Sequence, residues 1–212
     1  MAWNTKATGA YGRLTQEAYD NAQTVYAILY SLGWTLEAIC GVLGNIESES
    51  GYNPWRWQSD VVLPYQDPRI DYQNGHAYGL CQWDPAAKYI NNGSQYAGYG
   101  PNYSDRPGWI NDGSAQLMYL DAYADYYPTT YYPLSYAQYK AATIADYTIE
   151  YLTKAWFYNF ERGTWDDGRT AAANYWWATF NGTPPPDPPD PDPPMRKIPI
   201  WLLFKIKEAN RL

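Results

Sequence analysis

The chain has 212 residues, enough for one domain with its own core plus an appendage, but few for two ordinary domains. Its net charge of −7 argues against a general nucleic-acid binder, because such proteins gain affinity by neutralising phosphates. Tyr and Trp are abundant, with 24 and 11 copies against 4 of Phe. Rings with an apolar face and a polar edge suit a surface that stacks on sugars, and a general preference for Tyr explains them equally well.

Few residues are available for metal or disulfide chemistry. The chain has one His, His76, and two Cys, Cys40 and Cys81. This excludes the common structural zinc patterns, and we expect neither a metal nor a cofactor. The two Cys either form a disulfide or stay as buried thiols, and the sequence leaves both open.

The start of the chain shows no basic segment followed by an apolar one, so no signal peptide is expected. No apolar run reaches the roughly 18 residues that a spanning helix needs. If the protein acts outside a cell, we expect another route of delivery.

Two helices are predicted in the N-terminal part. The first begins at Thr15 and ends near Gly33. The second has Thr35 as its N-cap, and Gly41 and Gly44 permit the close approach of a neighbour. Its apolar stripe consists of Leu36, Ile39, Cys40, Leu43 and Ile46. A Gly-Tyr-Asn-Pro sequence then ends the helix.

Residues 55–113 lack a regular pattern and are rich in Gly, Pro, Asn and Asp, which is typical of a functional loop region. Within it, residues 78–83 are expected to be extended or in a turn. Helical patterns return over residues 114–125, 135–140, 142–160 and 170–180. The predicted fold class is α+β, mainly α, with a small loop or β-hairpin lobe inserted after the second helix.

Residues 181–194 contain eight Pro and are predicted to form a semi-rigid linker that ends a domain spanning residues 1–180. Residues 195–212 then carry five basic residues against one acidic, around the apolar run Trp201 to Phe204. This segment is interpreted either as a docking element for a membrane, wall polymer or virion partner, or as a piece packed on the core.

Two carboxylates, Glu47 and Glu49, stand at the end of the second predicted helix. At 100° per residue Glu47 falls near the middle of the apolar stripe and Glu49 near its edge, so at least one faces the interior or a cleft. Burial and the helix C-terminus both raise the pKa of such a carboxyl group. A glycosidase uses a neutral carboxyl of this kind as its general acid. The competing interpretation is two solvated residues at a helix end.

Motifs around this pair resemble those of the phage tail lysozyme family. Glu49-Ser50 is followed about thirty residues later by Gly79-Leu80-Cys81-Gln82, similar to a motif pair of lytic transglycosylases and goose-type lysozymes. The resemblance spans roughly residues 14–180. Further matches, in the same order along the chain, are Trp34, residues 38–45, Asn53-Pro54, Gln58, Gln82-Trp83 and Phe160-Glu161-Arg162.

The resemblance implies a lysozyme-like catalytic domain over residues 1–180, followed by the linker 181–194 and the docking element 195–212. It implies cleavage of the β-1,4 bond between N-acetylmuramic acid and N-acetylglucosamine in the glycan strands of bacterial peptidoglycan. The family's catalytic Glu falls on Glu49. The candidate substrate contacts are Gln82, Trp83, Ser50, Gln58 and Tyr78, with structural roles for Gln82 and Trp83 left open. A phage protein of this kind would act from a virion tail or from the host cytoplasm at lysis.

Departures from the related motifs leave parts of the mechanism open. The third transglycosylase motif is matched only loosely by Tyr158-Asn159, which favours hydrolysis over the anhydro-forming reaction. Glu161 and Arg162 pair either with one another at a helix end or with groups in the cleft. If the enzyme is a hydrolase, a second group is expected to stabilise the transition state or to activate water. This group is either a second carboxylate or a water held by polar side chains. The candidates for that carboxylate are Asp60, Asp67, Asp71 and Asp84.

Two other classes of protein compete with a muramidase. A peptidase would use Cys40 or Cys81 with His76, but Cys40 lies in mid-helix, whereas activated thiolates favour helix N-termini. A wall-binding or virion structural module without catalysis is the stronger alternative, because aromatic-rich acidic folds can bind glycans without cutting them.

Overall fold

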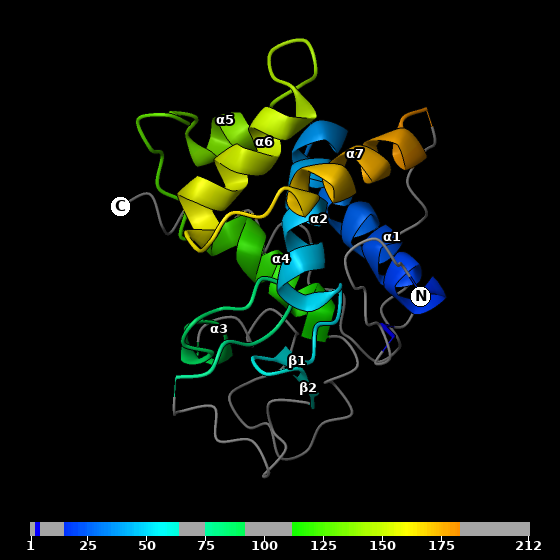
Figure 1. The fold of residues 1–212 in the computed structure, drawn as a ribbon, viewed down its shortest axis with the longest axis vertical. Coiled ribbons are helices and arrows are strands. Elements are labelled where there is room, and N and C mark those ends of the chain that lie inside the picture. Colours follow the sequence, from blue (N-terminus) through cyan, green and yellow to red (C-terminus); the bar gives the residue numbers. More distant parts are fainter. Residues whose placement is uncertain (1–2, 5–14, 64–74, 92–111, 183–212) are drawn as a thin grey trace, which may run out of the picture.

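The structure is a computed structural model, described here for residues 3–4, 15–63, 75–91 and 112–182. Its longer helices are α1 (Gln16–Ser31), α2 (Leu36–Ser50), α4 (Asp112–Tyr123), α6 (Ile149–Trp156) and α7 (Gly168–Phe180). Shorter elements are α3 (Ala87–Ile90), α5 (Tyr136–Lys140) and the strands β1 (Arg56–Trp57) and β2 (Val61–Val62). Figure 1 shows the β1–β2 hairpin and α3 at one end, and α5, α6 and α7 at the other. The predicted mainly α fold, with a hairpin lobe after the second helix, is confirmed.

The first two helices begin where the sequence predicts. The side chain of Thr15 accepts a hydrogen bond from Ala18 N at 3.2 Å, and that of Thr35 accepts one from Ala38 N at 3.3 Å. The left-handed Gly51, with φ of 58°, ends α2 directly after Ser50. The chain therefore changes direction sharply at Gly51, and this sets the point at which α2 ends.

The helix predicted over residues 142–160 is too long. Turns and irregular backbone precede α6, which begins only after Thr148 has capped it by accepting from Tyr151 N at 3.1 Å. After Trp156 the helix widens into a π-helical turn, η5 (Phe157–Glu161), which ends at Arg162 with φ of 58°. Periodicity does not reveal such a turn, although π-helical turns concentrate at functional sites.

Helix α2 occupies the centre of the helical part and contacts α1, α5, α6 and α7. The predicted close approaches at its glycines are confirmed. A Cβ on Gly41 would lie 2.5 Å from the hydroxyl oxygen of Tyr139, and one on Gly44 would overlap the carbonyl oxygen of Arg169. Gly44 therefore lets the start of α7 lie directly against α2.

The core is largely aromatic. Its most deeply buried tryptophans are Trp34, Trp55, Trp57, Trp156 and Trp176. Their N–H groups find acceptors: Trp34 Nε1 donates to Asp121 Oδ1 at 2.8 Å, and Trp176 Nε1 donates to the hydroxyl oxygen of Tyr52 at 2.5 Å. Much of the unusual Trp content therefore packs the interior, where a polar edge needs a partner.

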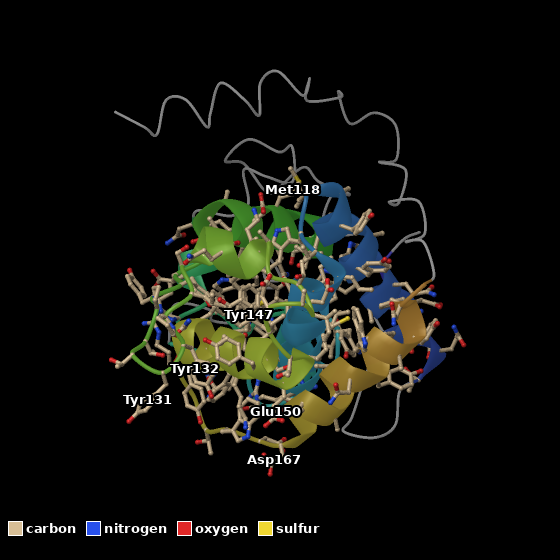
Figure 2. The ribbon with its side chains drawn as sticks, turned by 90° about the horizontal axis from the view of Figure 1, so that it is seen from above. Met118, Tyr131, Tyr132, Tyr147, Glu150 and Asp167 are labelled. Carbon is tan, nitrogen blue, oxygen red and sulfur yellow. The ribbon has the colours of Figure 1, made fainter. Side chains whose placement is uncertain are left out.

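A second group of rings forms an outer aromatic row, which we define by Tyr147, Tyr151, Tyr132, Tyr158 and Trp165. Consecutive ring centroids lie 5.0, 5.2, 5.3 and 6.2 Å apart. Figure 2 shows Tyr132 and Tyr147 over the outer side of α6, with Tyr131 at the edge of the molecule. Some of the many Tyr side chains therefore lie in this row near the surface and not in the core.

Cys40 and Cys81 are both buried free thiols, which resolves the alternative left open by the sequence. None of the helices in the described ranges has the length and apolar character required to cross a membrane. Most of the predicted linker, and the whole of segment 195–212, lie outside the described residues.

Candidate active site

Glu49 lies one residue before the end of α2, with 21% of its side chain exposed. Its Oε1 accepts a hydrogen bond from Arg169 Nη2 at 2.7 Å, and the two side chains form an ion pair. Arg169 comes from the first turn of α7, and only 8% of its side chain is exposed. The carboxylate that the sequence singles out is thus reachable from solvent and faces a nearly buried cation.

The guanidinium of Arg169 is held on several sides. Nη1 donates to Asn45 Oδ1 at 3.1 Å, and the guanidinium carbon lies 4.8 Å from the centre of the Phe157 ring. Its Nε is buried and has no acceptor among the described residues. A buried donor left without an acceptor costs about 1–3 kcal/mol, and this one lies beside the ion pair with Glu49.

Asn45 connects the three helices that carry the site. Its amide nitrogen donates to Gly41 O at 2.8 Å within α2 and to Thr153 O at 3.1 Å in α6. Its oxygen accepts from Arg169 of α7. The single buried amide therefore fixes α6 and α7 against the end of α2.

Glu161 ends the π-helical turn η5 and also belongs to this site. Its Oε1 accepts a hydrogen bond from Trp156 Nε1 at 3.2 Å, five residues earlier. Burial raises the pKa of Glu161 well above its usual range, and the charge of Glu49 raises it further. Arg169 and the Trp156 N–H act in the opposite direction without cancelling the rise. Glu161 is consequently a half-buried carboxyl group whose pKa is raised, and Glu49 contributes to the rise.

Arg162 does not pair with Glu161, so the helix-end salt bridge considered from the sequence is absent. Its Nη2 donates to Asp125 O at 2.6 Å, and its guanidinium carbon lies 4.7 Å from the Tyr127 ring centre. The left-handed backbone at Arg162 turns this side chain away from the turn that carries Glu161. Of the pair, only the carboxyl group reaches the vicinity of Glu49.

Glu47 is buried, as its place on the helical wheel predicts, with 7% of its surface exposed. It accepts a hydrogen bond from the hydroxyl of Tyr52 at 2.8 Å, and that same hydroxyl accepts from Trp176. Glu47 therefore belongs to a polar network inside the core, whereas Glu49 is the carboxylate beside Arg169.

The three polar side chains predicted to contact substrate form hydrogen bonds with other groups of the protein. Ser50 is fully buried, and its hydroxyl donates to Ile46 O at 3.2 Å. Gln82 Nε2 donates to Arg56 O and Gly79 O, each at 2.9 Å, and so braces the turn on the hairpin. Gln58 is exposed, and its Oε1 accepts from Ala77 N at 3.3 Å. Of the three, Gln58 alone presents a largely exposed side chain.

The two predicted aromatic contacts, Tyr78 and Trp83, lie in the core. Tyr78 has no exposed surface, and its hydroxyl donates to Asp112 Oδ2 at 2.7 Å. Trp83 is 7% exposed and stacks on Tyr89 at a centroid distance of 5.1 Å. Both rings therefore pack the lobe from inside, and their role as substrate contacts stays a prediction.

The Gly79-Leu80 part of the second motif has a packing reason. Gly79 has φ of 86°, and a Cβ there would lie 2.5 Å from Gln116 Oε1, the atom that accepts from Leu80 N at 2.7 Å. Gln116 Nε2 donates to Asp112 Oδ2 at 2.8 Å and to Pro54 O at 2.7 Å. The motif thereby fastens the turn over residues 78–83 to α4 and to the chain that leaves α2.

Of the four candidates for a second carboxylate, the structure describes Asp60 and Asp84, and no hydrogen bond or ion pair joins either of them to Glu49. Asp60 forms an exposed ion pair with Arg56, four residues earlier. Asp84 is exposed beyond the turn. Asp67 and Asp71 lie outside the described residues. Glu161, for which the sequence left open a pairing with groups in the cleft, is a carboxyl group that interacts electrostatically with Glu49.

The thiols are unsuited to nucleophilic catalysis. Burial raises the pKa of Cys81 well above its usual range, and Glu161 and Glu49 raise it further, while burial and then Glu37 raise that of Cys40. His76 is exposed. No group of three or more His, Cys, Asp or Glu side chains in the described ranges is arranged to hold a metal ion.

Arg169 is the site residue that sequence reasoning missed. It stands 120 positions from Glu49, and no motif includes it. A signal was nevertheless present, because Arg169 lies on the same helical stripe as the buried residues Ala173, Trp176 and Phe180 of α7. A lone cation on a buried stripe predicts a buried anion opposite to it.

Comparison of the sequence with known proteins assigns the chain to a family. The model of the family described as phage tail lysozyme matches residues 20–180, which include Glu49, Glu161 and Arg169. The chain is also 42% identical over 77 residues to morphogenesis protein 1 of Bacillus phage B103, a match that covers 36% of this chain and 18% of that protein. The chain thus spans less than a fifth of that relative. Since the family model covers most of the chain, this protein belongs to the phage tail lysozyme family.

Proposed function

We propose that this chain is a muramidase, which hydrolyses the β-1,4 bond between N-acetylmuramic acid and N-acetylglucosamine in peptidoglycan. The observation that carries the proposal is the position of Glu49, a partly exposed carboxylate at the end of α2 that faces Arg169 and neighbours Glu161. Membership of a lysozyme family supports cell-wall glycan as the substrate.

In the proposed reaction the protonated Glu49 donates its proton to the glycosidic oxygen as that bond breaks. Water then adds to the anomeric carbon of the N-acetylmuramic acid and releases a proton to the solvent, from which Glu49 is reprotonated, and a new reducing end results. Glu49 is ion-paired with Arg169 in the structure, so the site must take up one proton before it can act as an acid. The partial exposure of Glu49 allows the glycosidic oxygen to approach.

Hydrolysis is preferred to the transglycosylase reaction for a structural reason. The loose match to the third transglycosylase motif includes Asn159, which is fully buried. Asn159 Nδ2 donates to the hydroxyl of Tyr126 at 2.9 Å and to Tyr132 O at 2.8 Å, while its oxygen accepts from Thr129 N. The amide is fully engaged in holding the chain around residues 126–132, so it offers nothing to a glycan.

The test compares the full chain with Glu49→Gln and with Glu150→Gln as a matched control. Glu150 is an exposed residue of α6 that pairs with Lys154 at 2.6 Å, so its loss should leave activity unchanged. We expect Glu49→Gln to bind purified peptidoglycan but to release reducing ends at least a hundredfold more slowly, in the range typical of a lost acid catalyst.

The products distinguish the competing activities. New reducing ends identify hydrolysis, anhydro-muramoyl ends in the mass spectrum identify a transglycosylase, and new free amines identify a peptidase. Full turnover by Glu49→Gln would refute the assignment of Glu49. Binding of peptidoglycan by the wild type with no cleavage would instead favour a structural wall-binding module.

The proposed setting is a phage particle or an infected cell. The relative from Bacillus phage B103 is named a morphogenesis protein, a name that concerns assembly. Virion incorporation, membrane partition and activity on intact cells after deletion of residues 184–212 test whether segment 195–212 is a docking element. Unchanged behaviour in all three assays would argue against that role.

A further inference from the structure

One guanidinium holds the carboxylate of Glu49 by a single oxygen. We propose that Arg169 is a positioning residue for Glu49: it binds Oε1 and leaves Oε2 as the oxygen that gives its proton to the glycosidic bond. The proposal rests on the proposed muramidase function, because it names the part that each oxygen plays in that reaction. It concerns the orientation of Glu49 and adds no group that touches the substrate.

The guanidinium of Arg169 has a fixed position. Only 8% of the side chain is exposed. Nη1 donates to Asn45 Oδ1 at 3.1 Å, and Cζ lies 4.8 Å from the ring centre of Phe157. These partners belong to α2 and η5, so a side chain that starts on α7 is held by two other elements. The rotational freedom of this long side chain is therefore lost on folding and need not be lost again during the reaction.

Glu49 depends on its contact with Arg169. It stands in the last turn of α2, and 21% of its side chain is exposed. Among the described residues, the hydrogen bond from Arg169 Nη2 to Oε1 at 2.7 Å is the only one that its carboxylate makes. A long side chain with this exposure would otherwise sample several rotamers. The partner that is held more firmly sets the orientation of the other, so Arg169 positions Glu49.

The two oxygens of Glu49 are not equivalent in this arrangement. A guanidinium can bind both oxygens of one carboxylate through two parallel N–H groups, such as those of Nε and Nη2. Glu49 uses Nη2 only, and Nε has no acceptor among the described residues. Oε2 likewise receives no hydrogen bond from the described part of the chain, so it remains available to a ligand.

This difference decides which oxygen carries the catalytic proton. A protonated carboxyl group has one O–H, which donates, and one carbonyl oxygen, which accepts. Oε1 already accepts a hydrogen bond from Arg169, so it stays the carbonyl oxygen and the proton binds to Oε2. When the glycosidic bond breaks, its electron pair and that proton both go to the leaving oxygen. Glu49 is then a carboxylate that still contacts Arg169, so the arginine holds it throughout the reaction.

A positioning residue should act on kcat and not on KM. It touches no substrate, whereas misplacing a reacting atom by about 1 Å can slow a reaction about a hundredfold. Arg169→Lys keeps the positive charge but lacks the planar fork that reaches Glu49 and Asn45 together. We expect it to lower kcat by about tenfold or more and to leave KM within about twofold. Phe157→Leu keeps Arg169 but removes the ring beside its guanidinium, and should lower kcat in the same direction.

The experiment measures kcat and KM on soluble peptidoglycan fragments for the wild type, both variants and Arg162→Lys. Arg162 is the matched control, because it bonds to Asp125 O and lies against the Tyr127 ring but does not contact Glu49. Urea unfolding shows which variants are folded. A fall in kcat in both variants and not in the control supports the proposal. Unchanged kcat in folded variants would mean that charge alone suffices, and a raised KM with unchanged kcat would mean that Arg169 contacts substrate. Either result would overturn the proposal.

A readout without activity separates this proposal from the proposed function. In crystal structures the Glu49 carboxylate should occupy one position in the wild type, with Oε1 against Arg169, and more than one position in Arg169→Lys. An unchanged position of Glu49 in that variant would refute the role of Arg169. A carboxylate that loses its position in the variant, in a protein whose wild type cuts no glycan, would preserve the positioning and remove the muramidase.

Discussion

Glu49 Oε1 and Arg169 Nη2 lie 2.7 Å apart because Gly44 lets the first turn of α7 rest on α2. The contact between the helices is made by backbone: a Cβ on Gly44 would overlap Arg169 O and lie 2.8 Å from Ala173 Cβ. The distance between Glu49 and Arg169 thus depends on how closely α7 packs against α2.

Gly44→Ala should reduce activity more than stability. The added methyl group forces the start of α7 away from α2, at a cost of about 1–3 kcal/mol in the free energy of unfolding, and it carries Arg169 away from Glu49. Gly163→Ala is the matched control, because a Cβ there meets nothing closer than 3.9 Å. Urea unfolding and the rate of reducing-end release provide the two measurements. Equal activity of both variants would show that the position of α7 is irrelevant to catalysis.

Tyr78→Phe should lower stability and leave substrate affinity unchanged. The hydroxyl of Tyr78 donates to the buried Asp112, and its loss costs about 1–3 kcal/mol of unfolding free energy. The ring has no exposed surface with which to contact a glycan. The variant should therefore show an earlier urea midpoint with an unaltered KM. A raised KM at unchanged stability would restore the substrate contact that the sequence suggested.

Asp112 should make the protein less stable as the pH rises. Burial raises its pKa from 3.8 to about 6, although hydrogen bonds from Tyr89, Tyr78 and Gln116 oppose the rise. The folded state then binds a proton more tightly than the unfolded one. The stability that this group contributes is complete below about pH 4 and is lost as the pH passes through about 6. The full difference is about 3 kcal/mol.

The difference between wild type and Asp112→Asn isolates this effect from the other carboxyl groups. Asn cannot ionise, so the unfolding free energy of the variant should lack the decline between about pH 4 and 7 that Asp112 gives the wild type. Parallel curves for the two proteins over that range would mean that Asp112 titrates normally.

Both thiols should resist modification in the folded protein. Cys40 and Cys81 have 0% and 2% of their surfaces exposed, and burial raises the pKa of each thiol. Iodoacetamide at pH 8 should label neither residue within an hour, and both after addition of urea, as read by mass spectrometry. Rapid labelling of one thiol with loss of activity would revive the peptidase alternative.

Local signals in the sequence were sufficient for most of the helices. Thr15, Thr35 and Ser135 each stand where a polar cap precedes an apolar stripe, and each accepts the expected backbone hydrogen bond. The stripe of α2 also predicted the burial of Glu47. These features depend on residues three or four positions apart, which a single sequence displays directly.

The candidate site depends on contacts that no local pattern contains. Arg169 reaches Glu49 from 120 positions away, and Glu161 enters through a π-helical turn that interrupts a pattern predicted as continuous over residues 142–160. The burial of Tyr78 and Trp83 was not predicted for a related reason. The position of a ring in a motif does not indicate whether the ring faces a ligand or the core, which depends on the packing.

The π-helical turn has a consequence for the length of the chain. Hydrogen bonds from residue i to i+5, in place of i+4, accommodate one more residue per turn than an α-helix does. Deleting one residue from 157–160 would restore α-helical hydrogen bonding and place Glu161 four positions after Trp156, and positions four apart on an α-helix lie on the same side. The π-helical turn therefore absorbs one extra residue without moving Glu161 away from Trp156, and related sequences one residue shorter are expected to bring the same carboxyl group to that side through a regular α-helix.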